Sequence, residues 1–212
     1  MPFPFLTLCG IGALIAFVSI LQKTKNNYEN KSANIIGSDL ESERVEPKPL
    51  ELRYFEIDEF GGWYPKIDPL LLTMLDSFRD RWGYKVLVSP ALGAVGRDLP
   101  EGHSNYESQH NVRRWGAVRA IDVMPLRWSL ERNPVDPGRV LDRGLSKQEL
   151  EHAYNVARAV GFSGIGVYPD WEPFPGLHLD VRRDRSSESP AIWSGILING
   201  KQEYVEIERA FA

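Results

Sequence analysis

The segment GFSGIGVYPDWEPFPGLHLDV, residues 161–181, decides the fold of this chain. It contains two short apolar runs, residues 164–168 and 177–181, separated by a stretch rich in proline. Apolar runs bounded by turn residues are typical of neighbouring β-strands, so we expect these two to pair. Side chains alternate between the faces of a strand, so His178 and Asp180 point to one face and their apolar neighbours point to the core.

Two helices are expected around this strand pair. Apolar residues recur at helical spacing over residues 69–82, where Asp68 is the expected N-cap and Gly83 ends the helix. A second helix is expected over residues 146–160, because Ser146 and Glu149 have the spacing of a capping box and Gly161 follows.

Further strands complete the predicted sheet. Short runs at residues 85–89 and 119–124 have strand composition. Residues 192–198 and 204–207, joined across Asn199-Gly200, are expected to form a C-terminal hairpin. The sequence therefore predicts an α+β fold, with a small antiparallel sheet backed by two helices.

The chain before this region divides into two segments. Residues 2–21 contain no charged residue, and a helix of about 20 residues just spans a hydrocarbon core of about 30 Å. Nothing basic precedes the run and no clear cleavage site follows it, so we expect residues 1–22 to be a transmembrane anchor rather than a cleaved signal peptide. Residues 23–50 are polar and lack apolar periodicity, which predicts a flexible linker to a globular domain over residues 51–212.

Composition narrows the chemistry that this domain can carry. The chain has 212 residues, of which 42% are hydrophobic and 25% charged, as in globular proteins. A net charge of -4 offers no general attraction for nucleic acid. The one cysteine, Cys9, excludes an intrachain disulfide and a cysteine-rich zinc site. A metal site must therefore use histidine and carboxylate ligands.

Three residues have the types that such a site needs: His110, Asp122 and His178. Asp122 lies within an apolar strand, where a carboxylate is costly unless it is paired or binds a metal. Each residue also has an ordinary interpretation, because a strand histidine is often hydrogen-bonded structure and Asp122 has Arg119 and Arg182 as possible partners. Spacing alone does not decide between these interpretations.

The motifs Ser108-Gln-His110, Ala120-Ile-Asp122 and His178-Leu-Asp180, in this order, resemble the M15 family of zinc D-Ala-D-Ala and related peptidoglycan peptidases. That family has a Ser-x-His-x-x-Gly-x-Ala-x-Asp segment and a later strand with a third ligand, a histidine. The resemblance covers about residues 55–182 and is strongest to the forms carried by bacteriophages and prophages. It implies an M15/hedgehog-like fold in which His110, Asp122 and His178 bind Zn²⁺ and leave one position for water.

Departures from the family pattern affect the catalytic residues. His110 and Asp122 are further apart than in the compact motif, and Pro175 stands where many relatives place an acidic general base. The base is therefore expected to be Asp180 or Glu172, although Asp180 could equally orient His178 from behind. The usual arginine is missing at residues 89–91, so Arg97 is expected to pair with a substrate carboxylate or the developing oxyanion.

Two further residues are expected to contact substrate. Ser108 belongs to the first motif, and Trp115 flanks it, as Trp171 flanks the last. The tryptophans would line a groove for a glycan–peptide strand, with core packing as the equal alternative.

We therefore expect a membrane-anchored, single-pass zinc peptidase that cuts stem or cross-bridge peptides of peptidoglycan as an endopeptidase or a carboxypeptidase. The lysines after the apolar run favour a cytoplasmic head, on the wrong side for that substrate. A phage-encoded protein in a virion membrane, or a lysis enzyme in the bacterial inner membrane with its head facing the cell wall, resolves the conflict. The alternatives are an inactive metal-binding module that recognises peptidoglycan and a structural virion membrane protein.

Overall fold

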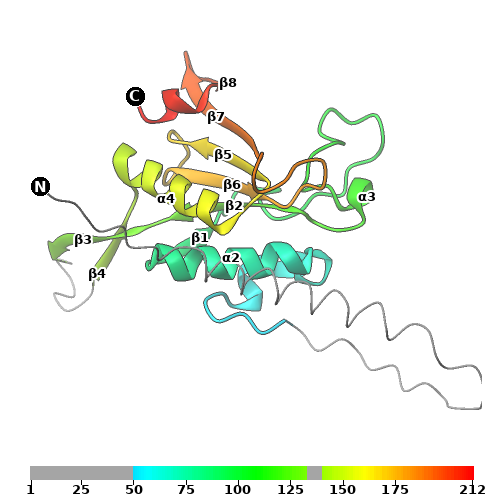
Figure 1. The fold of residues 1–212 in the computed structure, drawn as a ribbon, viewed down its shortest axis with the longest axis horizontal. Helices are drawn as coiled ribbons and strands as arrows, with labels where there is room; N and C mark the ends of the chain where they lie inside the picture. Colours follow the sequence, from blue (N-terminus) through cyan, green and yellow to red (C-terminus); the bar gives the residue numbers. More distant parts are fainter. Residues whose placement is uncertain (1–49, 133–139) are drawn as a thin grey trace, which may run out of the picture. The chain divides into compact units, whose positions relative to one another are not determined.

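The structure is a computed structural model that describes residues 50–132 and 140–212 (Figure 1). The anchor expected over residues 1–22 and the linker expected over residues 23–50 lie outside these ranges, except for Leu50. Within the described ranges, no helix is both long enough and apolar enough to cross a membrane.

The centre of the fold is a six-stranded sheet with the strand order β1-β2-β6-β5-β7-β8. Its strands are β1 (Val86–Val88), β2 (Ala120–Pro125), β5 (Gly164–Tyr168), β6 (Gly176–Asp180), β7 (Ala191–Ile198) and β8 (Lys201–Val205). The expected pairing of β5 with β6 is confirmed.

The expectation of an antiparallel sheet is wrong at one place, because β5 and β7 pair in parallel. The chain leaves β6 beside Gly164, the first residue of β5, and returns on the far side of that same residue at Ala191. Since β7 begins where β6 ends, it runs against β6 and therefore along β5. The sheet is mixed, within an α+β fold.

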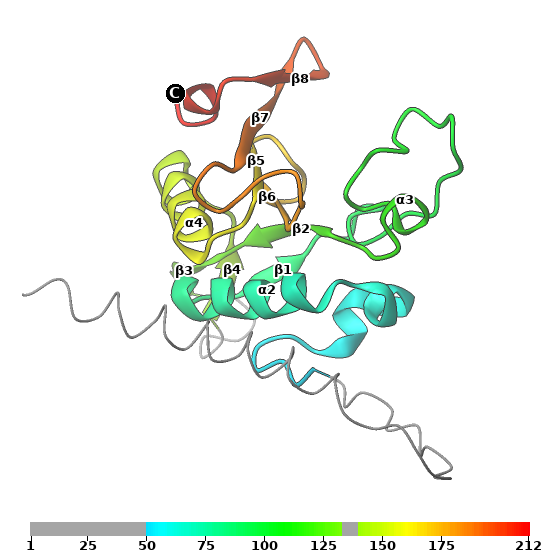
Figure 2. The same cartoon turned by 45° about the vertical axis from the view of Figure 1, so that its right-hand side comes forward.

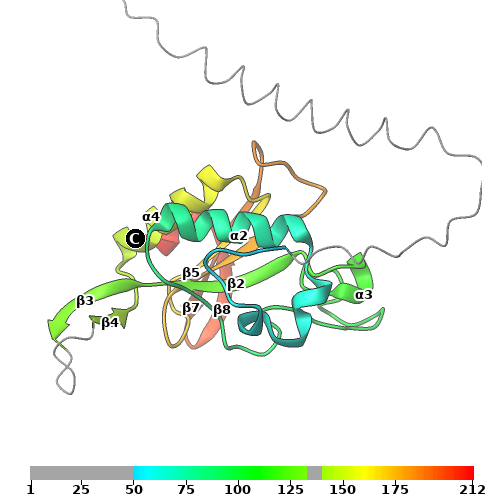
Figure 3. The same cartoon turned by 90° about the horizontal axis from the view of Figure 1, so that it is seen from below.

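Two helices, α2 (Pro69–Trp82) and α4 (Lys147–Val160), cover one face of the sheet, and α2 runs along it (Figure 3). The predicted signals at their ends are confirmed. The Asp68 carboxylate accepts a hydrogen bond from the Leu70 amide, and Gly83 ends α2 with a left-handed backbone. Ser146 and Glu149 form the expected reciprocal capping box of α4.

The hydrophobic core lies between these helices and the sheet. Leu71, Leu75 and Phe78 of α2 pack with Leu150 of α4 against the apolar residues of the central strands, and all are almost completely buried. The core face of the sheet is built from Ile121, Val123, Ile165, Val167, Leu177 and Leu179. Because strand side chains alternate, the residues between them point to the opposite face.

The C-terminal hairpin is confirmed, and it extends that opposite face. Asn199 and Gly200 connect β7 to β8 with φ angles of 53° and 76°, as two-residue hairpin turns require. β8 begins at Lys201, earlier than expected, and the chain enters the 3-10 helix η2 (Ile207–Ala210) where a strand was expected. The hairpin and the loop that leads to α3 (Val112–Trp115) rise on the side of the sheet away from α2 (Figure 2).

Several elements of the structure were not expected from the sequence. They are the 3-10 helix η1 (Ile57–Lys66), the short helix α3, and a separate two-stranded sheet of β3 (Arg127–Arg132) and β4 (Val140–Arg143).

Candidate metal centre

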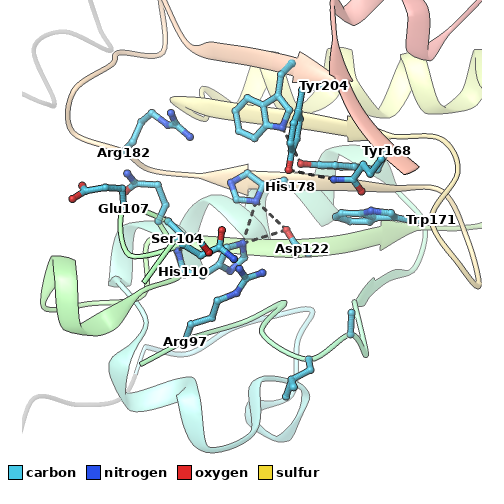
Figure 4. A pocket seen from close by; sticks show the side chains of 17 residues that line it. Arg97, Ser104, Glu107, His110, Asp122, Tyr168, Trp171, His178, Arg182 and Tyr204 are labelled. Atoms are coloured by element: carbon cyan, nitrogen blue, oxygen red, sulfur yellow. Dashed lines mark hydrogen bonds and ion pairs between the residues drawn. The ribbon is translucent and has the colours of Figure 1, made fainter. Parts of the chain in front are cut away.

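Three potential metal ligands meet on the face of the sheet opposite the core (Figure 4). Asp122 of β2 and His178 of β6 are directly opposite each other in the strand register, so their side chains emerge side by side. His178 Nδ1 lies 2.9 Å from Asp122 Oδ1 and 3.1 Å from His110 Nε2. His110 Nε2 lies 3.3 Å from the same carboxylate oxygen. Two ring nitrogens and one carboxylate oxygen therefore converge on a single point.

The longer spacing between His110 and Asp122 is absorbed by an excursion of the chain. The Arg119 amide donates to the Gln109 carbonyl at 2.9 Å, which closes the excursion at its base. Inside it, Asn111 caps α3 and is completely buried. Its side-chain amide donates to the carbonyl oxygens of Leu99 and Tyr106 and accepts from the Leu99 amide. Asn111 therefore fixes the loop that carries His110.

Hydrogen bonds on the far sides of both imidazoles determine which nitrogen faces the cluster. His110 Nδ1 lies 3.2 Å from the Val95 carbonyl oxygen, which can only accept, so Nδ1 carries the proton. His178 Nε2 lies 3.1 Å from Asp180 Oδ2 and donates to that carboxylate. In the neutral form, His110 Nε2 and His178 Nδ1 therefore point unprotonated lone pairs at the same place as the Asp122 oxygen. Three electron-pair donors so arranged repel one another unless a proton or a metal ion lies between them.

The charges around the cluster also favour a cation. Burial raises the pKa of Asp122, but the adjacent His110 and His178 outweigh it and hold this pKa well below its usual range. Burial lowers the pKa of His178, yet hydrogen bonds with Asp122 and Asp180 raise it to about 9. Without a metal, a proton on His178 and the guanidinium of Arg182 therefore balance the carboxylates of Asp122 and Asp180. A metal ion that displaces this proton would meet one negative charge in excess.

The residues fit a metal ion. An ion held tetrahedrally with bonds of about 2.0–2.1 Å sets its ligand atoms about 3.3 Å apart, close to the separations found here. The side chains are almost buried, with exposed fractions of 3% for His110, 13% for Asp122 and 11% for His178. His110, Asp122 and His178 could therefore hold a metal ion that remains reachable from one side.

That open side is a cavity of about 690 Å³. Of the residues expected from the sequence, it brings together the three metal-ligand candidates with Arg97, Ser108 and Trp171. The Arg97 amide donates to the His110 carbonyl at 2.9 Å, and its side-chain Nε donates to Gly93 O at 3.1 Å. Arg97 is thus attached to the metal-binding loop, with the outer nitrogens of its guanidinium toward the cavity (Figure 4).

Asp180 lies behind His178 and does not line the cavity. It is completely buried, and Arg182 Nη2 donates to its Oδ2 at 2.6 Å while Arg182 Nε donates to its Oδ1 at 2.9 Å. The histidine and the guanidinium hold its pKa well below its usual range, against the effect of burial. A carboxylate so engaged is a poor proton acceptor, and the geometry favours the orienting role for Asp180.

Glu172 and Trp115 also lie away from the cavity lining. Glu172 is exposed in the loop between β5 and β6. The Trp115 indole donates to the Ser108 carbonyl at 2.9 Å, and its ring lies beneath the guanidinium groups of Arg114 and Arg119. Trp115 braces the loop that carries Ser108. Of the described residues that line the cavity, only Asp122 and Glu107 carry carboxylates.

Most of the opposite wall of the cavity was not expected from the sequence. This wall consists of Tyr168, Trp171, Trp193, Gln202 and Tyr204, of which only Trp171 had been considered. The sequence does place glycines and aromatic residues on the same face of β5 and of β7. This pattern predicts that aromatic rings pack over glycine backbone, but it does not predict that the rings meet at one cavity.

Comparison of this chain with family models, with curated proteins and with solved structures found no match.

Proposed function

We propose that this protein is a zinc-dependent peptidase that hydrolyses peptide bonds in peptidoglycan. The observation that carries the proposal is the convergence of His110, Asp122 and His178 at the wall of an open cavity, with both imidazoles oriented from behind. Two histidines and one aspartate with an accessible fourth position suit Zn²⁺ well. Bound there, zinc would lower the pKa of a water ligand to about 7 and polarise the scissile carbonyl.

The chain's own residues would bind and orient the substrate. The Arg97 guanidinium is placed to pair with a substrate carboxylate or the developing oxyanion. On the opposite wall, the Tyr168 hydroxyl accepts a hydrogen bond from Trp193 Nε1 at 2.9 Å, which holds this polar group at the cavity. Burial raises the pKa of Tyr168, which keeps this hydroxyl protonated.

Accepting the proton of the attacking water requires a base. Glu172 and Asp180 are the candidates from the sequence, and Glu107 is the candidate from the cavity lining. Glu107 is ion-paired with Arg114 at 3.0 Å, and its side chain is 67% exposed. Among Glu107→Gln, Glu172→Gln and Asp180→Asn, the variant that retains metal but loses turnover identifies the base.

The scarcity of a suitable base in the cavity lining favours a second function. Among the described residues that line the cavity, the carboxylates are the metal-ligand candidate Asp122 and the ion-paired Glu107, which suits a module that binds metal and recognises peptidoglycan without cutting it. Zinc content together with muropeptide release from purified cell walls separates the two functions. Zinc bound without release of muropeptides would contradict the peptidase and leave recognition as the remaining function.

The zinc assignment has its own test. Asp122→Ala is expected to lose metal and activity together, whereas Asp58→Ala, at an exposed carboxylate in η1, retains both. An Asp122→Ala protein that kept both would refute the ligand assignment.

We further propose that the domain is phage-encoded and anchored by residues 1–22 in a virion membrane, or in the bacterial inner membrane with the domain facing the cell wall. The apolar run of residues 2–21 supports this proposal. Protease accessibility of the domain in intact particles or cells tests it, and a domain protected in the host cytoplasm would contradict the role in the cell wall.

A further inference from the structure

One wall of the cavity is an aromatic surface whose rings the proposed peptide chemistry does not use. It is formed by Tyr168 of β5, Trp171 of the following loop, Trp193 of β7 and Tyr204 of β8 (Figure 4). The ring of Trp193 lies 5.2 Å from that of His178, centroid to centroid. The aromatic wall therefore begins directly beside the candidate metal ligands.

Glycines in the sheet make room for this wall. A Cβ atom on Gly166 would lie 2.6 Å from the Trp193 ring, and one on Gly176 would lie 2.6 Å from the Trp171 ring. A Cβ on Gly195 would collide with Tyr168 in the same way. Carbon atoms in contact lie about 3.5–4.0 Å apart, so no side chain fits at these positions. The rings of Trp193, Trp171 and Tyr168 thus pack directly against glycine backbone, which fixes their positions.

The outer end of the wall is exposed and polar at its edge. Tyr204 is 68% exposed, although it lines the cavity. Its hydroxyl accepts a hydrogen bond from Gln202 Nε2 at 3.2 Å, which leaves the hydroxyl proton free to donate. The Arg182 guanidinium lies 5.3 Å from the centre of the Trp193 ring and also lines the cavity. Aromatic faces are therefore bordered by hydroxyl, amide and guanidinium groups.

This combination matches the chemistry of a sugar ring. A pyranose has apolar C–H faces, which stack on aromatic rings, and hydroxyl or acetamido groups around its edge, which need hydrogen-bond partners. An apolar peptide side chain would use the rings but leave the polar border without partners. Among the described lining residues, the carboxylates are the metal-ligand candidate Asp122 and Glu107, which is ion-paired with Arg114, so no unpaired carboxylate at the border is left to select a cationic ligand.

We propose that Trp193, Tyr204 and Gln202 form a saccharide subsite that takes an N-acetylated hexosamine of the glycan strand. The inference rests on the proposed function, because it places the glycan on β7 and β8 and the attached peptide over His178 and Arg97. The C-terminal hairpin is then part of the substrate-binding site.

Binding of an N-acetylglucosamine tetramer to the full-length chain tests the proposal. Titration in the presence of a chelator, followed by tryptophan fluorescence, reports binding without any hydrolysis. Tyr204→Ala and Gln202→Ala are each expected to weaken binding about three- to tenfold, since one stacking contact and one hydrogen bond are of this size. Trp128→Ala, at an exposed aromatic outside the cavity lining, and Gln148→Ala, at an exposed position of α4, are the matched controls and should bind as the wild type does.

A sugar-free stem peptide is the second probe. Tyr204→Ala is expected to weaken the saccharide more than the peptide. The proposal is overturned if the wild type shows no saccharide binding at millimolar concentration, if the two variants bind as the controls do, or if the peptide is weakened as much as the saccharide. Saccharide binding that depends on Tyr204, in a protein that hydrolyses no muropeptide, would support the subsite and contradict the proposed peptidase activity.

Discussion

Asp180→Asn tests whether this carboxylate orients His178 or acts as a base. The substitution keeps the shape of a completely buried side chain and removes its charge. Asp180 accepts from both His178 Nε2 and Arg182, whereas an asparagine would present an amide N–H group to one of these two donors. In either orientation of the amide, His178 loses the charged acceptor that directs its Nδ1 lone pair at the metal position.

The expected loss follows from this arrangement. Removing the outer partner of a metal-bound histidine typically costs 10–100-fold in metal affinity, which corresponds to about 1.4–2.8 kcal/mol. The protein should also become less stable, because Arg182 loses its counter-ion at a side chain that is only 20% exposed.

Competition with a chromophoric zinc chelator measures the affinity, at a temperature where circular dichroism shows the variant to be folded. Asp58→Asn makes the same chemical change at an exposed carboxylate and should leave the affinity unchanged. A folded Asp180→Asn protein with wild-type zinc affinity would refute the orienting role. If such a protein had also lost turnover, Asp180 would be the base instead.

Three other perturbations test the fold beneath the site. Hydrogen bonds with Arg143 and with Ser146 at the α4 cap lower the pKa of Glu149 to about 2. The ionised Glu149 carboxylate therefore contributes fully to folding stability above pH 4.5, and this contribution is lost as the pH falls toward 2. Glu149→Gln should therefore lower the free energy of unfolding by about 1–2 kcal/mol in a urea titration at pH 7. This difference from the wild type should vanish near pH 2, and a difference independent of pH would contradict the role given to Glu149. Leu75→Ala should lower the free energy of unfolding by about 2–5 kcal/mol in a urea titration, because Leu75 is completely buried between α2 and the sheet, and a loss below 1 kcal/mol would place it outside the core. Gly166→Val should displace the Trp193 ring and change the near-ultraviolet circular dichroism, whereas an unchanged spectrum would show that the ring does not lie on Gly166.

The sequence by itself determined the features that depend on neighbours along the chain. Asp68, Ser146 and Glu149 cap helices by bonds that reach two or three residues, and Asn199-Gly200 turns the hairpin through its own backbone angles. The alternation along residues 177–181 likewise put His178 and Asp180 on one face of a strand. Such interactions need no knowledge of the rest of the fold, so motif and spacing predict them.

Only the tertiary structure decided how these features meet. The contacts of His178 with Asp122 and His110 join residues 56 and 68 positions apart, and they depend on strand register and on the loop held by Asn111. The parallel pairing of β7 with β5 is equally non-local, and it brings Trp193 and Tyr204 to the cavity. The roles open to Asp180 were equal in the sequence, because a carboxylate on the same face as His178 can either reach the cavity or hydrogen-bond that histidine from outside the cavity. Burial and the bonds from Arg182 distinguish these roles, and both arise only when the strands are assembled.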